Sequence, residues 1–271
     1  MSRPFTSVAV AAAVVIVLGV GARLDAQRGG GSPQAPPTPR AAAPIDLTGY
    51  WVSIVTQDWR WRMVTPAKGD YQGIQLTPEA RKVADAWDAA RDEAAGEQCR
   101  SYGAPALMSV PGRLHISWQD DRTLKIETDA GMQTRLLHFG DYKAPPDAPR
   151  TWQGVSVAAW QTPRPNVPLQ LRPAQRTADA PPLRLTGGSL RVVTTNLRAG
   201  YLRKNGVPYS ENTVVTEFWD FHRRPDGEEW LTITTQVDDP QYLRAPRLVA
   251  PLFKKEPDGA KWDPTPCSSR W

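Results

Sequence analysis

The fold is decided by residues 113–139, which read RLHISWQDDRTLKIETDAGMQTRLLHF. Within residues 113–118 apolar side chains alternate with polar ones, which is the period of a β-strand with one buried face. Residues 123–128 and 133–139 continue the pattern after short turns that contain Asp and Gly. This stretch therefore predicts an antiparallel meander of three strands.

Segments of similar strand character, separated by turn residues, occur on both sides of the meander. They are expected at residues 47–56, 60–65, 152–160, 189–196, 213–221, 229–237 and 247–255. About ten short strands with few helices are typical of an antiparallel barrel or of a sandwich. The sequence thus predicts a mainly β fold and leaves the choice between barrel and sandwich open.

One packed helix is predicted from Thr77 to about Ala94. Thr77 can cap it, Pro78 suits the first helical position, and Glu79 favours the positive end of the helix dipole. The expected apolar stripe consists of Val83, Trp87, Ala90 and Ala94. Such a helix packs across a sheet or closes a barrel end, with a partner-binding helix as the alternative.

The N-terminal residues 1–26 have the pattern of a secretory signal peptide. Arg3 precedes an apolar run over residues 8–20, and small residues follow the run. Cleavage is expected after Ala22 or Ala26. An uncleaved anchor is the alternative, but a membrane-spanning helix needs about 20 apolar residues. We therefore expect a periplasmic or secreted chain with no stable membrane insertion after processing.

The remaining chain is expected to contain one linker and one domain. Residues 27–44 consist mainly of Gly, Pro and Ala and predict a flexible linker. Residues 45–271 are expected to form a single β-rich domain. Within it, residues 162–186 are rich in Pro and Arg and show no periodicity. A loop of this length is either a lid over a binding site or a disordered insertion.

The composition excludes several classes of function. The chain has 33 Lys and Arg against 28 Asp and Glu, and its net charge of +5 is too small to predict a nucleic-acid partner. Its 3 His and 2 Cys have no ligand-like spacing, so neither a metal nor another cofactor is expected. The sequence also contains no phosphate-binding loop, dinucleotide fingerprint or nucleophile elbow.

In an oxidising compartment, Cys99 and Cys267 are most simply paired in a disulfide. An even number of cysteines in an exported protein is usually a paired number. Two free buried thiols and a thiol-based site are the alternatives.

The strand expected over residues 213–221 carries the most reactive candidate. One of its faces consists of Thr213, Val215, Glu217, Trp219 and Phe221. Burial among apolar groups would raise the pKa of Glu217 and suit it to general acid or base catalysis. Arg135 shares a strand face with apolar residues and is the expected counter-charge. The alternative is a purely structural ion pair between Glu217 and Arg135.

Several other side chains are candidates for a site. His138 is a candidate for stabilising negative charge beside Glu217, and His115 lies on a neighbouring strand of the meander. These histidines would meet only if their face of the sheet lines a cavity; otherwise both are exposed. Glu211 would bind a ligand hydroxyl at the rim or cap a turn. The candidate ligand-binding residues are Glu211, Trp219, His115 and Tyr209.

Trp59 and Trp61 alternate with Arg60 and Arg62. On a strand, this pattern would give an aromatic and cationic surface suited to a sugar or a polyphenol. The alternative is a strand whose Trp side chains pack inward while its Arg side chains face water.

The sequence Gly49-Tyr50-Trp51 at the first expected strand resembles the Gly-x-Trp motif of lipocalin and calycin barrels. In those barrels the Trp fills the closed end beneath the ligand cavity, and a late Arg or Lys stacks on it. The resemblance implies that Arg247 or Lys254 is this partner of Trp51. It also implies a barrel that encloses one small apolar ligand.

A wider series of short motifs runs through residues 45–267. The motifs are Glu97-Gln98-Cys99, Arg135, Trp152-Gln153-Gly154-Val155-Ser156 with Trp160, Gly188-Ser189-Leu190-Arg191-Val192-Val193-Thr194-Thr195, Gly206-Val207-Pro208-Tyr209-Ser210-Glu211, Val215-Thr216-Glu217, Asp238-Asp239-Pro240 and Cys267. Their order resembles a large family of exported, uncharacterised β-rich bacterial proteins. Val155 departs from the pattern, in which a His is expected after the Gly. The resemblance implies an exported β-rich fold and no particular activity.

Three classes of function follow from these observations. The leading hypothesis is an exported, lipocalin-like barrel that binds a small apolar or aromatic molecule. The second is a cofactor-free lyase or isomerase in which Glu217 moves a proton while Arg135 and His138 stabilise developing negative charge. The third is a periplasmic assembly or scaffold subunit with a protein partner, for which a large exposed apolar patch is expected.

Overall fold

The structure is a computed structural model that describes residues 36–161 and 188–270. The chain divides into two compact units, Met1–Pro36 and Pro37–Trp271, and the second unit contains the fold described below. The expected signal peptide, the linker up to residue 35 and the expected loop at residues 162–186 lie outside the described residues.

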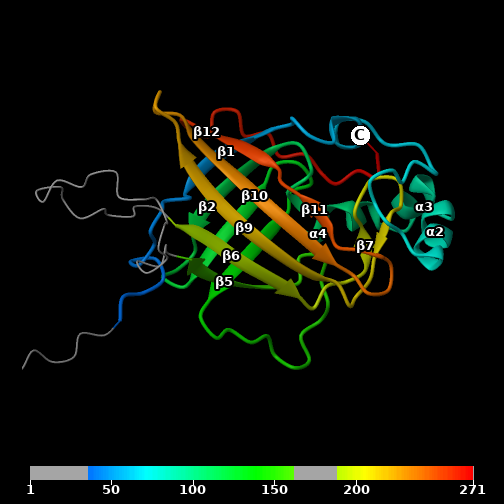
Figure 1. The fold of residues 1–271 in the computed structure, drawn as a ribbon, viewed down its shortest axis with the longest axis horizontal. Coiled ribbons are helices and arrows are strands. Elements are labelled where there is room, and N and C mark those ends of the chain that lie inside the picture. Colours follow the sequence, from blue (N-terminus) through cyan, green and yellow to red (C-terminus); the bar gives the residue numbers. More distant parts are fainter. Residues whose placement is uncertain (1–35, 162–187, 271) are drawn as a thin grey trace, which may run out of the picture. The chain divides into compact units, whose positions relative to one another are not determined.

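Nine strands form a closed barrel, and a tenth strand, β11 (Arg247–Val249), pairs with the strand β10 of this barrel (Figure 1). Around the barrel the strands are β1 (Gly49–Ile54), β2 (Arg113–Trp118), β3 (Thr123–Thr128), β4 (Thr134–Phe139), β5 (Val155–Gln161), β6 (Ser189–Thr195), β9 (Val214–Arg223), β10 (Glu229–Asp238) and β12 (Leu252–Glu256). The pairing of β9 with β10 closes the ring. The mainly β prediction is thus confirmed, and the fold is a barrel rather than a sandwich.

The meander β2–β3–β4 forms as its alternating pattern predicts. Its strands pair antiparallel, with Ile116 opposite Ile126 and Leu124 opposite Leu137. These apolar side chains face the interior because successive residues of a strand point to opposite faces of the sheet. The chain then returns from β4 to β5 in the parallel direction, and the other neighbouring strands of the barrel are antiparallel.

Two expected strands differ from the structure. Residues expected as a strand over 60–65 instead begin in a short helix, α1 (Trp59–Arg62). The strand expected over residues 247–255 is split into β11 (Arg247–Val249) and β12, which pair with different parts of β10. Pro251 lies at the break, where its missing N–H cannot contribute to a ladder.

The prediction of one continuous helix from Thr77 to Ala94 is also wrong, because the chain forms two helices there. α2 (Pro78–Asp85) is capped as expected by the Thr77 hydroxyl, which accepts a hydrogen bond from the Ala80 N–H. The carboxylate of Asp88 then caps α3 (Ala89–Ala94), so the helix restarts in a new direction. The buried apolar residues of the two helices are Ala80, Ala84 and Ala89 rather than the expected stripe, whose Ala90 and Ala94 are exposed.

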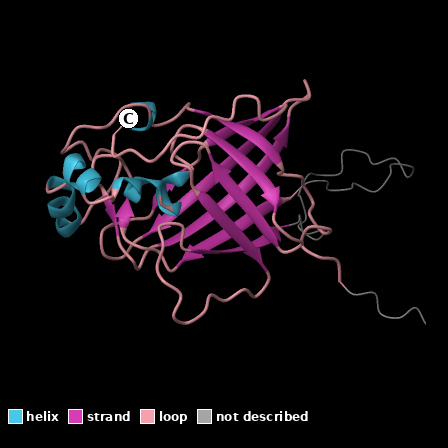
Figure 2. Cartoon of the chain, turned by 180° about the vertical axis from the view of Figure 1, so that it is seen from behind, coloured by secondary structure: helices cyan, strands magenta, loops and turns pink. Residues whose placement is uncertain are grey.

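The remaining short elements lie at the same end of the barrel as α2 and α3 (Figure 2). They are the 3₁₀ helix η1 (Gln98–Tyr102), α4 (Ala104–Leu107), β7 (Gly200–Tyr201) and β8 (Pro208–Tyr209). Gly206 in the turn between β7 and β8 has a positive φ of 79° and packs so closely against Trp87 that a side chain would not fit. This contact holds the hairpin against the helices.

Two apolar cores stabilise this arrangement. The first fills the barrel interior and includes the large, fully buried side chains Trp51, Trp219, Phe253, Ile116, Ile126 and Leu137. The second joins the helices and the β7–β8 hairpin to the barrel end through residues such as Tyr71, Leu76, Leu202, Tyr209, Val215 and Val237. The end that carries the helices is therefore a continuation of the folded core.

The predicted disulfide between Cys99 and Cys267 is present and ties η1 to the C-terminal segment. The compact unit also extends further toward the N-terminus than the expected boundary at residue 45. Trp160 donates a hydrogen bond to the carbonyl of Pro39, and the Arg40 N–H donates one to the carbonyl of Asp121. Within the described part of the chain, no helix combines the length and apolar character that a membrane crossing requires.

Candidate functional site

Arg135 and Glu217 form an ion pair inside the barrel. Arg135 Nη1 and Nη2 lie 3.1 and 2.5 Å from the two Glu217 carboxylate oxygens. The guanidinium also donates to the hydroxyls of Ser156 and Thr194, at 3.2 and 2.8 Å. The two side chains are 1% and 0% exposed. The expected pairing is confirmed, and the hydroxyls of Ser156 and Thr194 take part in it, while the catalytic role stays a prediction.

The structure does not bring His115 and His138 together. His115 stacks on Tyr50, with ring centroids 4.3 Å apart, and pairs with Glu127 at 3.1 Å. His138, near the end of β4, stacks on Tyr142 in the loop that follows this strand, with ring centroids 3.8 Å apart. Burial lowers the pKa of His138, and the nearby charge of Asp120 partly opposes this shift. Both histidines are half-buried on the outer face of the barrel, away from the Arg135–Glu217 pair.

The other candidate ligand residues also lie in separate places. Trp219 belongs to the barrel core and Tyr209 to the second core. Glu211 is exposed and lies 3.5 Å from Arg150. Burial raises the pKa of the Tyr209 hydroxyl, which has no hydrogen-bond partner among the described residues. These residues do not form one site, and their individual roles stay predictions.

The cation over Trp51 is neither of the two expected residues. Lys255 places its ammonium 5.4 Å from the Trp51 ring, whereas Lys254 faces Trp230. Successive residues of β12 point to opposite faces, which is why Lys255 rather than Lys254 reaches the ring. Arg247 lies elsewhere, at the start of β11, and its surroundings define a different site.

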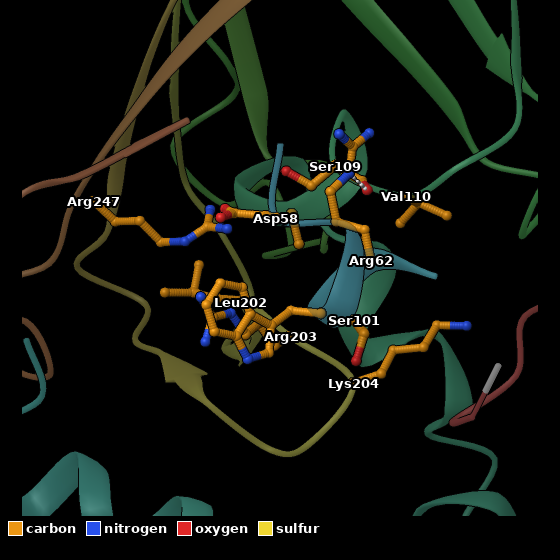
Figure 3. A pocket seen from close by; sticks show the side chains of 11 residues that line it. Asp58, Arg62, Ser101, Ser109, Val110, Leu202, Arg203, Lys204 and Arg247 are labelled. Carbon is orange, nitrogen blue, oxygen red and sulfur yellow. Dashed lines mark hydrogen bonds between the residues drawn. The ribbon is translucent and has the colours of Figure 1, made fainter. Parts of the chain in front are cut away.

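A small pocket between the barrel end and the helices gathers four cationic side chains (Figure 3). It is lined by Asp58, Trp61, Arg62, Ser101, Ala106, Ser109, Val110, Leu202, Arg203, Lys204 and Arg247. Asp58 is the acidic member of this set. Arg62, Arg203, Lys204 and Arg247 are each 8% exposed or less. We call this lining set the cationic pocket.

The helix α1 supplies one side of the cationic pocket. Because residues 59–62 are helical, the alternation expected for a strand does not apply, and Trp59 is 63% exposed while Arg62 is only 5% exposed. The expectation that Trp packs inward while Arg faces water is therefore wrong for this pair. Trp61 lies beneath the guanidinium of Arg203, at 4.4 Å from its ring centroid.

The turn between β7 and β8 supplies a second side. Its sequence Leu202-Arg203-Lys204-Asn205-Gly206 is that of a solvent-exposed turn, yet these residues are buried. Backbone carbonyls accept hydrogen bonds from some of the side chains in this turn. Arg203 Nη1, for example, donates to the carbonyl of Gln72 at 2.8 Å. Lys204 donates to the Tyr102 hydroxyl at 2.7 Å. The third side is Arg247 of β11.

Three guanidinium groups of the pocket have N–H groups left over. Arg62 donates to the carbonyl of Ser109 and the hydroxyl of Ser53, but its Nη1 has no partner. The same holds for Nε of Arg203 and Nη1 of Arg247 within residues 36–161 and 188–270. Most buried polar groups in folded proteins have a partner, so three such donors in one pocket call for a physical explanation.

The charges of the pocket act on one another. Burial lowers the pKa of Arg62 and of Arg203, and Asp58 opposes both shifts. Burial, together with the charge of Arg203, lowers the pKa of Arg247 to about 10. Burial lowers the pKa of Lys204 to about 8. The site therefore carries excess positive charge in a poorly hydrated place, which an anion would neutralise.

The dimensions of the pocket limit what it can hold. Its cavity volume is about 30 Å³, which is room for roughly two ordered water molecules. Sites for whole drug-sized ligands are usually about 300–1,000 Å³. The pocket can hold one small anion or the anionic group of a larger molecule, with Leu202 and Val110 as apolar walls.

A larger groove lies beside Ile45 and Phe221, with a volume of about 570 Å³. Its charges balance, because Asp46 and Glu229 offset Arg223 and Lys255, and Glu229 contacts both of these cations. It therefore lacks the unbalanced charge of the cationic pocket. Neither of these two pockets is lined by Arg135 or Glu217.

Comparison of the chain with protein-family models, with curated proteins and with solved structures gave no match. Within the described ranges, no group of three or more His, Cys, Asp or Glu side chains is placed to hold a metal ion. The functional assignment therefore depends on the geometry and the charge of the cationic pocket.

The Arg135–Glu217 pair yields a first prediction. Glu217→Gln leaves Arg135 charged and buried without a counter-charge, so we expect a loss of about 3–5 kcal/mol in the free energy of unfolding. Urea denaturation measures this loss. Glu211→Gln is the matched control, because Glu211 is exposed and its replacement should change stability by less than about 0.5 kcal/mol.

A gain of stability in Glu217→Gln would contradict the structural role. Catalytic groups are often kept at the expense of stability, so that result would favour the acid–base hypothesis instead.

The low pKa of Lys204 yields a second prediction. Because its pKa falls from 10.5 to about 8 on folding, the unfolded chain binds more protons between these values, and stability rises with pH there. Lys204→Met removes this contribution. The free energy of unfolding of the variant, relative to that of wild type, should therefore be highest near pH 7 and should fall progressively toward pH 10. Urea denaturation at several pH values measures this difference. A difference that does not change with pH would show that the buried ammonium keeps its ordinary pKa.

Proposed function

We propose that this chain is an exported binding protein in which a β-barrel supports a site for a small anion or for the anionic group of a small molecule. The observation that carries the proposal is the set of unpartnered N–H groups on Arg62, Arg203 and Arg247. The proposal keeps the small-molecule ligand expected from the sequence. It differs from the sequence-based hypothesis in the chemistry of the ligand, because the group bound by the pocket is anionic rather than apolar.

Energetic reasoning supports this choice of site. Removing an ion from water costs roughly several kcal/mol unless it is paired and hydrogen-bonded. Arg135 meets that condition through Glu217, whereas Arg247 has Asp58 alone as a nearby carboxylate and retains an unpartnered N–H. An oxyanion would supply acceptors to several guanidinium groups at once, and Arg suits this task because its planar donors match carboxylate and phosphate oxygens.

Export is supported by two features of the chain. The N-terminal sequence has a charged start, a short apolar run and small residues after it. The disulfide between Cys99 and Cys267 suits an oxidising compartment, where such bonds persist. The proposal therefore includes a periplasmic or secreted location. It also includes membership of an exported β-rich family, which the series of short motifs in the sequence supports.

The two rival hypotheses rest on other observations. The lyase or isomerase hypothesis needs a substrate beside Glu217, whose carboxylate oxygens both face Arg135 within the packed interior. The assembly-subunit hypothesis needs an exposed apolar surface, and Trp59, Met63 and Val64 are exposed in and just after α1. Both stay predictions, and neither explains the N–H groups of Arg62, Arg203 and Arg247 that lack a partner among the described residues.

Replacing Arg247 tests the proposed function. The panel consists of inorganic phosphate, sulfate and acetate, measured by thermal denaturation. At about 100 times its Kd, a bound anion adds about 2.7 kcal/mol, which corresponds to a rise of roughly 5–10 °C in Tm. Arg247→Met should abolish this rise. It should also leave the anion-free Tm unchanged or higher, because it removes a buried charge without breaking a hydrogen bond.

Arg224→Met provides the control, since it removes the same charge from an exposed turn. It should leave the anion-dependent rise intact, which separates site binding from a general effect of net charge. The proposed function is wrong if none of the three anions raises the Tm of the wild-type chain, or if Arg247→Met keeps the full rise.

A further inference from the structure

Asp58 places an acceptor among the donors of the cationic pocket. It precedes α1 at the position where an Asp side chain usually caps a helix, but it makes no side-chain capping hydrogen bond. Figure 3 shows its carboxylate pointing toward the guanidinium of Arg247. Its charge opposes the lowering of the pKa of Arg62, of Arg203 and of Arg247.

The backbone at Asp58 is held in an unusual conformation. Its φ of 55° and ψ of 24° lie in the left-handed region, which costs most non-glycine residues roughly 1 kcal/mol or more. Asp and Asn tolerate this region better than other side chains. In this conformation the Asp58 carboxylate makes no capping hydrogen bond to the N–H groups of α1, and it lines the pocket instead. This suggests that the acceptor has a purpose in the site.

A carboxylate in an anion site discriminates between ligands. An ionised carboxylate can only accept hydrogen bonds, so it repels an anion whose oxygens carry no proton. An oxyanion that keeps a proton can donate it to the carboxylate in a hydrogen bond while its other oxygens accept from the arginines. Such a ligand satisfies Asp58 and the unpartnered N–H groups of Arg203 and Arg247 together.

From this geometry we infer that the cationic pocket selects an oxyanion that retains a proton at neutral pH, with inorganic phosphate as the ligand class, over a fully deprotonated anion such as sulfate. The inference rests on the proposed function, since it specifies the ligand of the same site. The arginines supply affinity for any small oxyanion, and Asp58 supplies the selection.

The size of the expected selection follows from the hydrogen bond involved. A hydrogen bond to a charged group contributes about 1.5–3 kcal/mol, which corresponds to about 10- to 100-fold in affinity. Sulfate would lose this bond and would also place an unprotonated oxygen against the Asp58 carboxylate. We therefore expect phosphate to bind at least about tenfold more tightly than sulfate near pH 7.

Isothermal titration calorimetry of the full disulfide-bonded chain with phosphate and with sulfate tests the inference. Asp58→Asn keeps the shape of the side chain and suits the left-handed backbone, but its amide can donate to sulfate. This substitution should tighten sulfate binding and reduce the preference for phosphate to less than about threefold. Asp58→Gly also suits the backbone and removes the acceptor altogether, so it should give the same loss of preference.

Asp141→Asn is the matched control. Asp141 is exposed just after β4 and does not line the pocket, so its replacement makes the same change in charge and should keep the preference for phosphate.

Equal affinity of wild type for phosphate and sulfate would overturn the inference while leaving the proposed anion site intact. So would a preference for phosphate that persists in both Asp58 variants. If neither phosphate nor sulfate binds, the inference is overturned, and if acetate does not bind either, the proposed function itself is overturned.

Discussion

The interior of the barrel is filled with side chains of its own strands, and this packing decides where a ligand can bind. Trp51, Trp219 and Phe253 are fully buried in the interior, and the Arg135–Glu217 pair is buried there with them. Closing the sheet through β9 and β10 leaves no free edge in the ring, and the alternation of each strand then fixes which residues face inward. The chemistry that the fold offers to a ligand is therefore concentrated where the helices and the β7–β8 hairpin meet the barrel end.

Two buried arginines differ in how far their charge is compensated. Arg135 donates to Glu217, Ser156 and Thr194, so its burial is compensated by charge and by hydrogen bonds. Arg247 is buried to a similar degree, has its pKa lowered to about 10, and keeps an N–H without a partner. A fold that tolerates such a group loses stability in the absence of a ligand and gains binding energy in its presence. This contrast is the main reason to assign function to the cationic pocket.

The mainly β fold and the Arg135–Glu217 pair could be predicted because both follow from local alternation, whereas the choice of a barrel over a sandwich could not. The period of two over residues 113–139 fixes the inward face, and the same rule places Glu217 among apolar neighbours. The helix expected from Thr77 to Ala94 was divided by Asp88, whose side chain begins a second helix even though the surrounding residues favour helix. Local pattern alone does not show that a second capping residue ends the first helix and begins another.

The cationic pocket could not be predicted in the same way. Arg62, Arg203 and Arg247 come from three distant segments, and Arg is exposed in most proteins. Trp59 to Arg62 has the alternation of a strand but forms one turn of helix, which reverses the exposure expected for Trp and Arg. The polar turn at Leu202 to Gly206 is buried by the helices packed over it. Only the tertiary arrangement of these segments brings the charges together.

The central claim is that the N–H groups of Arg62, Arg203 and Arg247 that lack a partner among the described residues serve to bind an anion. A crystal structure of the chain grown with phosphate tests this claim most directly. The account predicts tetrahedral density in the cationic pocket, with oxygens within hydrogen-bond distance of Arg203 and Arg247 and one oxygen against the Asp58 carboxylate. Water alone in the pocket at saturating phosphate, with Arg247 donating directly to Asp58, would contradict it.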